Sequence, residues 1–566
     1  MLIISVFLGV VGALGAELFL YLLRLADTWF LDAIAHYQTI TVAAAHARGA
    51  PPLPFTHFYW WMPLATTLGG LAAGILIYGL APETEGHGTD AAITAFHDKA
   101  GRMRARAPFV KIIVSALTIG SGGSGGREGP TAQIAAGVGA IVGSLFKLDD
   151  DERRTVVLIG MAAGLSAIFK SPLGTAIFAV EILYSRMAFE GNALIYTLIS
   201  ASVAYAIVGA FSGYTPLFLL PAASDRMVQP TDLLWFALLG ILCGGLGALL
   251  PKVYYTVRDG FRALRMPNAL KPALGGLLVG VIGIFIPPVI GGGYGYMQFA
   301  LQGGTGLAAW VLLLFALGKM VTLSFTIGSG GAGGMFGPTL YVGAAFGAAV
   351  AAFLQLFHVP IDSSSLAVVG MAAVFAGAAR VPIASMVMVI EMTGSFHLIA
   401  PTMLAVALAF IVQFGLTRRA RYPTIYEAQL PTPAQSPVYR KAYYDTVADL
   451  LRRRQIQLDD DLLSEELRDS LEQGHGVALS NAGGERLYRL ALAPGSPVVG
   501  QEVRSLALDK LGVVIVGLIR GEGNVVPNGS TQLQVGDGLL VAAGASGIDG
   551  FRSLIQAPTM APPITG

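Results

Sequence analysis

The chain has 566 residues, of which 54% are hydrophobic and only 13% are charged, and its mean hydropathy is +0.65. Soluble domains carry about 25% charged residues. A chain so poor in charge cannot cover the surface of several soluble domains with polar side chains, which excludes that class of protein. The bulk of the chain is therefore expected to lie in lipid.

Charge is distributed unevenly along the chain. Residues 431–566 hold 12 Lys/Arg and 15 Asp/Glu, which leaves 24 and 20 for the first 430. Neither part has the clustered basic surface that nucleic-acid binding requires. We expect a membrane body followed by a more polar tail, and no nucleic-acid partner.

The N-terminal segment MLIISVFLGVVGALGAELFLYLL has no basic leader and no cleavage-like end, so it predicts a first membrane helix and not a removed signal peptide. Further along, Cys243 is the only cysteine and lies in an apolar run, where packing explains it. The apolar runs that are long enough to span a bilayer are 62–80, 192–219, 233–250, 273–290 and 398–416. Glycine and proline break other runs early: 110–119, 132–146, 155–169, 173–185, 338–356, 366–378 and 383–393.

Glycine-rich segments recur along the body at a nearly constant offset. Between Ile119–Thr131 and the segment 208 positions later, ten of thirteen positions match. The block GMAA with a following Pro and Glu recurs at an offset of 210, and Gly86 and Gly88 recur as Gly293 and Gly295. This order predicts an internal duplication with halves at about 1–225 and 230–430. Repeated broken helices in a membrane domain indicate a transporter or channel with its site at the repeat interface.

Glycine segments that open helices offer backbone N–H groups at the positive end of the helix dipole. Acidic residues are few in the body, and no ring of them lines a candidate pore as in many cation channels. Neutral amides of this kind favour a small anion as the substrate.

The segments GSGGSGGREGP and GSGGAGGMFGPTL resemble the signatures of the chloride channel and transporter (CLC) family over roughly residues 1–430. The resemblance implies an all-α polytopic membrane protein with an inverted internal repeat and broken helices. It also implies a homodimer in the cell membrane, with one chloride pore in each subunit and both termini in the cytoplasm. The basic cluster at 418–421, directly after the last apolar run, fits that orientation.

The resemblance also assigns individual residues. Glu128 in GREGP falls on the gating glutamate, whose carboxylate competes with the anion and leaves when protons bind it; the alternative is a permanent pair with Arg127. A lone acid at a helix start inside the membrane is costly unless it is functional. The residues expected to surround the anion are Gly86, His87, Gly88, Arg127, Glu128, Gly129, Met335, Phe336 and Tyr426. Tyr426 could instead be an interfacial anchor.

Two departures from the family pattern bear on function. His87 stands where a serine is common, and its ring either donates to the anion, more strongly when charged, or points away and leaves only backbone contacts. Ile182, next to Glu181, stands where proton-coupled members carry a second glutamate that relays protons. Isoleucine cannot carry a proton, which favours a passive channel over the alternative, a chloride/proton antiporter.

The tail is expected to contain a helical charged connector at 431–485 and a small α+β cytosolic domain at 486–566. Short alternating runs, RLYRLAL, GVVIVGLIR and DGLLVAA, predict its strands. The domain resembles the TrkA-C (RCK-C) type, which implies dimerisation and a possible small-molecule ligand that regulates transport. Alternatively, the tail only aids assembly.

The tail alone would suggest a different class of function, a cation transporter. The sequence shows no metal-ligand spacing, no cofactor fingerprint and no clustered nucleophile and base, so neither an enzyme nor a metal site is expected. The expected partners are chloride or a similar small anion, protons at Glu128 and the lipid bilayer.

Overall fold

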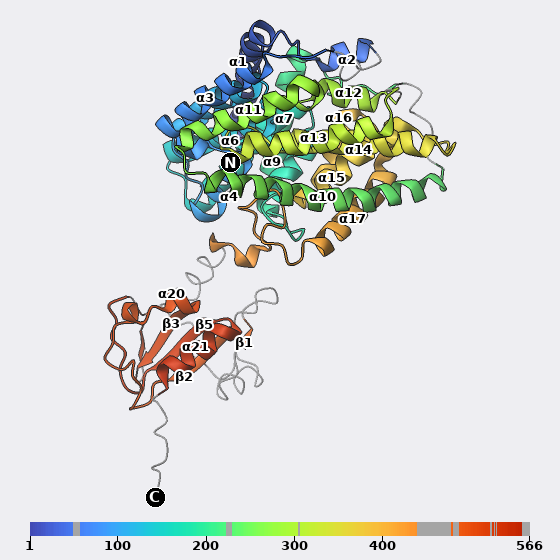
Figure 1. Cartoon of the computed structure of the whole chain (residues 1–566). Helices are drawn as coiled ribbons and strands as arrows, with labels where there is room; N and C mark the ends of the chain where they lie inside the picture. The colour runs from blue at the N-terminus through green and yellow to red at the C-terminus, as the bar shows by residue number, and fades with distance from the viewer. Residues whose placement is uncertain are drawn as a thin grey trace, which may run out of the picture. The chain divides into compact units, whose positions relative to one another are not determined.

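The computed structural model of the chain describes residues 1–48, 57–221, 229–303, 306–438, 477–478, 486–520, 523–525, 527 and 529–556. It divides into two compact units, Met1–Pro431 and Thr432–Gly566 (Figure 1). The expected helical connector at 431–485 lies almost entirely outside the described residues. Cys243 is buried in the first unit, as packing requires.

The first unit is a bundle of α-helices, which includes all the expected apolar runs. Its N-terminal half contains α1 (Leu2–Asp27), α2 (Val42–Arg48), α3 (Met62–Leu80), α4 (Thr89–Asp98), α5 (Arg106–Gly120), α6 (Glu128–Leu145), α7 (Asp150–Phe169), α8 (Pro172–Glu181) and α9 (Gly191–Ser212). Its C-terminal half contains α10 (Asp232–Ala263), α11 (Lys271–Phe285), α12 (Tyr294–Leu301), α13 (Ala309–Gly328), α14 (Phe336–Gln355), α15 (Ser363–Ala379), α16 (Pro382–Thr393) and α17 (Ile399–Leu416).

Eight helical segments in the described residues are long and apolar enough to cross a membrane. Two of them differ from the sequence-based expectation. The run at 338–356 was expected to be broken, but α14 is a continuous helix because its glycines lie against a neighbour; a Cβ on Gly343 would lie 2.3 Å from the carbonyl oxygen of Gly370 on α15. Helix α13 was not among the expected spans, although its mean hydropathy of 1.9 is that of a spanning helix even with Lys319 in it.

The two halves make the same contacts with each other, as expected for an inverted repeat. The backbone N–H of Gly126 donates to the carbonyl of Gly334 at 2.7 Å, and the N–H of Gly334 donates back at 2.6 Å. Likewise, Ser124 N donates to the Thr326 hydroxyl at 2.8 Å, and its counterpart Ala332 N donates to the Thr118 hydroxyl at 3.3 Å. These reciprocal bonds show that the glycine segments of both halves meet at the centre of the unit.

Local signals explain where two of the helices begin and end. Asp149 and Asp362 cap the N-termini of α7 and α15 by accepting from backbone N–H groups three residues later. Both helices end at a residue in the left-handed conformation, Lys170 or Arg380, and a proline follows at the first turn of the next helix. Helices α10, α11 and α13 pack side by side across the front of the unit (Figure 1).

The second unit contains an antiparallel sheet in the order β1-β2-β5-β3-β4. The expected runs form β2 (Arg486–Ala491), β3 (Val513–Arg520) and β5 (Gly538–Ala543), joined by β1 (Val477–Ala478) and β4 (Gly523–Val525). Helix α21 (Ala545–Ile555) covers one face, with Phe551 fully buried against Leu539 and Val541 of the central strand. The unit is therefore the small α+β domain that the sequence predicts, with a hydrophobic core of its own.

Candidate functional site

The glycine motifs bring the starts of α4 and α6 together inside the first unit. Gly88 precedes α4 with a φ of +84°, and a Cβ there would lie 2.5 Å from the carbonyl oxygen of Gly129. A Cβ on Gly129 would lie 1.9 Å from the carbonyl oxygen of His87, so both positions require glycine. The segments that contain Gly86, His87, Gly88, Arg127, Glu128 and Gly129 therefore lie in direct contact, as the sequence predicts.

Glu128 lies across the start of a helix from the other half of the chain. Its side chain is 1% exposed, and its carboxylate accepts from the backbone N–H of Gly337 at 3.2 Å. Gly337 lies in the first turn of α14, where free N–H groups and the helix dipole favour an anion. The carboxylate thus occupies a place where a small anion would bind.

A tyrosine that the sequence analysis did not single out completes this contact. The hydroxyl of Tyr294, at the start of α12, donates to the carboxylate of Glu128. Its ring also lies against the guanidinium of Arg127, whose Cζ is 4.2 Å from the ring centroid. Within the described residues no ion pair joins Arg127 to Glu128, which differs from the alternative of a permanent pair. The repeat offset could have identified Tyr294, because it falls on the position of His87 in the first half.

His87 lies beside Tyr426, with ring centroids 5.4 Å apart, and both side chains are buried. The imidazole Nε2 contacts the carboxylate of Asp90 at 3.0 Å, one helical turn along. That same carboxylate accepts from the backbone N–H groups of Glu427 at 3.1 Å and Ala428 at 3.3 Å. Asp90 therefore ties His87 to the segment that carries Tyr426, a role that the sequence analysis missed.

Phe336 is held in an aromatic cluster. Its ring lies 4.5 Å from that of Phe169, 4.1 Å from that of Phe375 and 5.9 Å from that of Phe178, measured between centroids. Met335, which precedes it, is 1% exposed. The cluster fixes the start of α14 and makes an apolar wall there, so the available polar groups are backbone amides.

Two buried lysines hold the motif segments in place by donating hydrogen bonds to their backbone carbonyl groups. Lys111 donates to the carbonyl oxygens of Thr84 and Gly86, each at 2.8 Å. In the second half, Lys319 donates to the carbonyl of Gly291 at 2.6 Å, and both side chains are fully buried. A buried cation inside a membrane is costly and usually functional. Here each lysine orients one loop and places positive charge near the candidate anion path.

The position expected to relay protons is apolar and enclosed. Ile182 is fully buried, and the neighbouring Glu181 accepts from the backbone N–H groups of Ile383 at 3.1 Å and Ala384 at 2.6 Å. Those groups open α16, so the carboxylate of Glu181 is held as a helix cap. Ile182 has no titratable group, and the carboxylate of Glu181 is held by these two backbone hydrogen bonds.

A hollow of about 700 Å³ reaches α4 and α6 from the surface. Lys99, Arg102 and Arg104 line it, together with Gln133 of α6, whose Oε1 lies 3.1 Å from the position of a Cβ on Gly88. Glu83 and Asp150 pair with some of these cations. The cations outnumber those carboxylates, so the hollow favours the approach of anions.

In the part of the chain that the structure describes, no group of three or more His, Cys, Asp or Glu side chains is placed to hold a metal ion. The candidate site therefore consists of backbone amides, two aromatic hydroxyls, His87, Glu128 and buried cations. Such a set binds and releases an anion without covalent chemistry.

Comparisons with known proteins agree with this chemistry. Residues 69–413 match the model of the voltage gated chloride channel family, and residues 487–556 match the TrkA-C domain. A putative chloride channel protein ClcB-like of Ralstonia nicotianae is 33% identical over 427 residues, which covers 73% of this chain and 93% of the relative. An H(+)/Cl(-) exchange transporter ClcA of Vibrio campbellii is 31% identical over 362 residues, which covers 62% of this chain and 76% of the relative.

Solved structures show the same fold. The structure of a slow cyanobacterial Cl-/H+ antiporter superposes with a TM-score of 0.62 at 24% identity, over 75% of this chain and 95% of that one. A CLC-type fluoride/proton antiporter gives a TM-score of 0.61 at 21% identity, over 76% and 96% of the two chains. The chain is an integral membrane protein that belongs to the CLC family of anion transporters and carries a C-terminal TrkA-C domain.

Proposed function

We propose that this protein carries chloride across the cell membrane through a pathway within each subunit, and that Glu128 is the gate of that pathway. The observation that carries the proposal is the contact between the Glu128 carboxylate and the Gly337 amide at the start of α14. A bound carboxylate and a bound anion exclude each other at that amide. Protonation removes the negative charge of the gate and frees the amide for chloride.

The proposed anion ligands lie on both sides of this amide. Backbone groups of Gly86, Gly88 and Gly129 line the first half of the path, and those of Met335 and Phe336 line the second. Arg127 supplies positive charge, and His87 and Tyr426 supply polar side chains. Their support is proximity: His87 lies beside Tyr426, and the loops of Gly88 and Gly129 are in contact.

For the coupling, the geometry favours passive conduction. Ile182 is fully buried and apolar, and the adjacent Glu181 carboxylate is held by two backbone N–H groups. Proton exchange is the second candidate, since relatives that are about 30% identical are named H(+)/Cl(-) exchange transporters. In this chain exchange would require a titrating group other than the one missing at 182.

A paired flux assay tests the coupling. Purified protein is placed in liposomes, a chloride gradient is imposed, and chloride and proton movement are recorded together. Passive conduction predicts chloride flux without uphill proton movement, whereas a fixed ratio of protons to chloride would establish exchange. Repeating the assay without residues 432–566 measures the effect of the tail.

Glu128→Gln tests the gate in the same liposomes. The variant keeps the shape of the side chain and removes its charge, so chloride flux should rise or lose its dependence on pH. The same flux in both forms from pH 4.5 to 7.5 would contradict the gate.

A cation transporter, the alternative that the tail alone suggests, would give a reversal potential that follows potassium when chloride and potassium gradients are opposed.

The remaining assignments follow from the same proposal. The transmembrane domain is assigned to 1–430 with repeat halves at about 1–225 and 230–430, the connector to 431–485 and the TrkA-C domain to 486–566. The protein is proposed to form a homodimer with both termini in the cytoplasm. Its TrkA-C domain is proposed to bind a small-molecule ligand that regulates transport.

A further inference from the structure

The proposed gating by Glu128 assigns no role to the pair formed by His87 and Asp90. The imidazole of His87 is 6% exposed, and its Nε2 lies 3.0 Å from a carboxylate oxygen of Asp90. A carboxylate at this distance accepts a hydrogen bond, which assigns the proton of the neutral ring to Nε2. In the neutral ring Nδ1 then carries a lone pair.

The second ring nitrogen is free to take up a proton. Nδ1 of His87 is buried and has no hydrogen-bond partner among the residues that the structure describes. When Nδ1 carries a lone pair, it repels an anion. When the ring is an imidazolium, the N–H at Nδ1 donates to an anion. Anion binding beside this ring and proton uptake by it are therefore linked, and each strengthens the other by the same factor.

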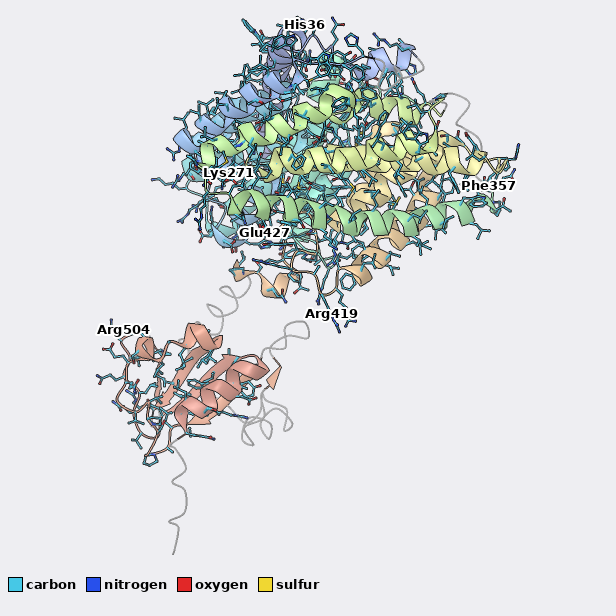
Figure 2. All side chains as sticks on the ribbon, viewed as in Figure 1. His36, Lys271, Phe357, Arg419, Glu427 and Arg504 are labelled. Carbon is cyan, nitrogen blue, oxygen red and sulfur yellow. The ribbon has the colours of Figure 1, made fainter. Side chains whose placement is uncertain are left out.

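Asp90 connects the same pair to the rest of the pathway. Its carboxylate accepts from the N–H groups of Glu427 and Ala428, directly after Tyr426, whose ring lies beside that of His87. Asp90 thus holds both ring and tyrosine segment in place. Figure 2 shows Glu427 in the lower half of the helical unit, between Arg419 at its lower margin and His36 at its top.

Charged groups from several elements surround the pair. They are Glu85 before the motif, Lys111 of α5, Arg127 and Glu128 at the start of α6, Arg258 of α10 and Glu427 after α17. Arg258 is bound to the carboxylate of Glu427 at 2.5 Å. With Asp90, these groups contain more carboxylates than cations, so an imidazolium at His87 reduces the imbalance of charge.

We propose that His87 and Asp90 form a second proton-binding site, separate from Glu128, at which Nδ1 of His87 takes up one proton when an anion binds beside Tyr426. The acid form of the buffer in the bulk solvent supplies the proton, the imidazole becomes an imidazolium, and the charge of the anion offsets that of the ring. The proposal rests on the proposed function. It gives the chain a titrating group in the pathway although Ile182 cannot carry a proton.

The test is a calorimetric chloride titration of the purified full chain in detergent, in two buffers of different ionisation enthalpy. The Glu128→Gln background removes the proton uptake of the gate. We expect up to one proton taken up per chloride bound, with an uptake that depends on pH. Chloride affinity should rise by at most about tenfold for each unit by which the pH falls.

Three further variants identify the group. In the Glu128→Gln background, His87→Ser replaces the imidazole with the hydroxyl that is common at this position in the family. Chloride should then bind without proton uptake and independently of pH. Asp90→Asn removes the charge that stabilises the imidazolium, and the midpoint of proton uptake should move to lower pH. His97→Gln is the matched control, since His97 is also buried on α4 but its Nε2 lies 3.2 Å from the carbonyl oxygen of Leu183. That control should leave proton uptake unchanged.

Equal proton uptake in Glu128→Gln and in Glu128→Gln/His87→Ser would overturn the proposal and leave chloride transport intact. If His87→Ser yields too little folded protein, His87→Gln provides the same readout. No chloride binding and no flux in the unchanged chain would instead overturn the proposed function. The two failures are therefore distinguishable.

Discussion

Glu181 and Glu391 cap helices of opposite halves: each carboxylate accepts from the backbone at the start of the helix to which the other belongs. Glu181 of α8 accepts from Ala384 N on α16 at 2.6 Å, and Glu391 of α16 accepts from Gly174 N on α8 at 2.8 Å. The two halves are therefore joined by two carboxylate caps, one at the N-terminus of α8 and one at the N-terminus of α16. It also engages the carboxylate of Glu181, which directly precedes Ile182.

Removing one of these charges should destabilise the membrane unit. A glutamine amide has one accepting oxygen, so in Glu391→Gln it cannot accept both from Gly174 N and the Ser171 hydroxyl, which share Oε2, and from Leu173 N, which donates to Oε1. A charged hydrogen bond contributes about 1.5–3 kcal/mol. We expect a clearly lower midpoint of thermal unfolding in detergent. The control is Asp151→Asn, because Asp151 is 87% exposed and its pair with Arg154 contributes little. A midpoint shared by both variants would contradict the capping role.

Tyr294→Phe should loosen the gate. The variant removes the hydroxyl that donates to the Glu128 carboxylate, so the charged carboxylate is held less firmly at α14. We expect roughly tenfold higher chloride flux near neutral pH, and a pH profile whose midpoint moves to higher pH. Liposome flux measured from pH 4.5 to 7.5 gives both quantities.

A matched control exists for this tyrosine. The hydroxyl of Tyr341 is buried without a partner in the described part of the chain, so Tyr341→Phe removes a hydroxyl without touching Glu128. Its pH profile should match that of the unchanged chain. In Glu128→Gln, the further change Tyr294→Phe should have little effect, and an additive increase would show that Tyr294 acts by another route.

Lys319→Met should disturb the loop that carries Tyr294. Its ammonium group donates to the carbonyl oxygens of Val289, Ile290 and Gly291, and a buried carbonyl left unsatisfied costs about 1–3 kcal/mol. We expect lower thermal stability and a weaker dependence of chloride flux on pH. Lys252→Met on the exposed face of α10 is the control and should change neither quantity. Full pH dependence in Lys319→Met would show that the loop holds its position unaided.

In the TrkA-C domain, stability should fall at acidic pH. The guanidinium of Arg520 binds Asp537 through both carboxylate oxygens at 2.8 Å and lowers the pKa of Asp537 below its ordinary value of 3.8. A carboxyl with a lowered folded-state pKa stabilises the fold above its ordinary value, and this contribution is lost as pH falls through the folded value.

Urea unfolding of residues 432–566 at several pH values measures this effect, since the domain has a hydrophobic core of its own. We expect stability to decline as pH drops below about 4. Asp537→Asn should lower stability near pH 7 and flatten the decline at acidic pH. A decline as steep in the variant would assign the acid sensitivity to other groups.

Much of the fold can be predicted from the sequence because both halves of the membrane unit contain the same motifs. The spacing of these motifs alone predicts where the broken helices meet, and it predicts that Glu128 lies near the segment of Phe336. Lys111 and Lys319 stand at the same position of the two repeat blocks, so their shared role could also have been read there.

Other parts of the site depend on packing that spacing does not reveal. Asp90 follows the GHG motif by two residues, but its hydrogen bonds to Glu427 and Ala428 span more than 330 positions. The side-chain direction of Tyr294 depends on how α12 packs against α14. Lys319 can lie in the apolar helix α13 because its ammonium group donates to carbonyl oxygens of the loop before α12, a contact that spacing does not reveal.

The paired hydrogen bonds between Gly126 and Gly334 have the form of a contact between two identical partners, in which each gives what it receives. A chain with only one half could have made the same contact with a second copy of itself. The centre of the membrane unit therefore has the geometry of an interface between two identical partners. Its two faces are not identical, because one holds His87 where the other holds Tyr294.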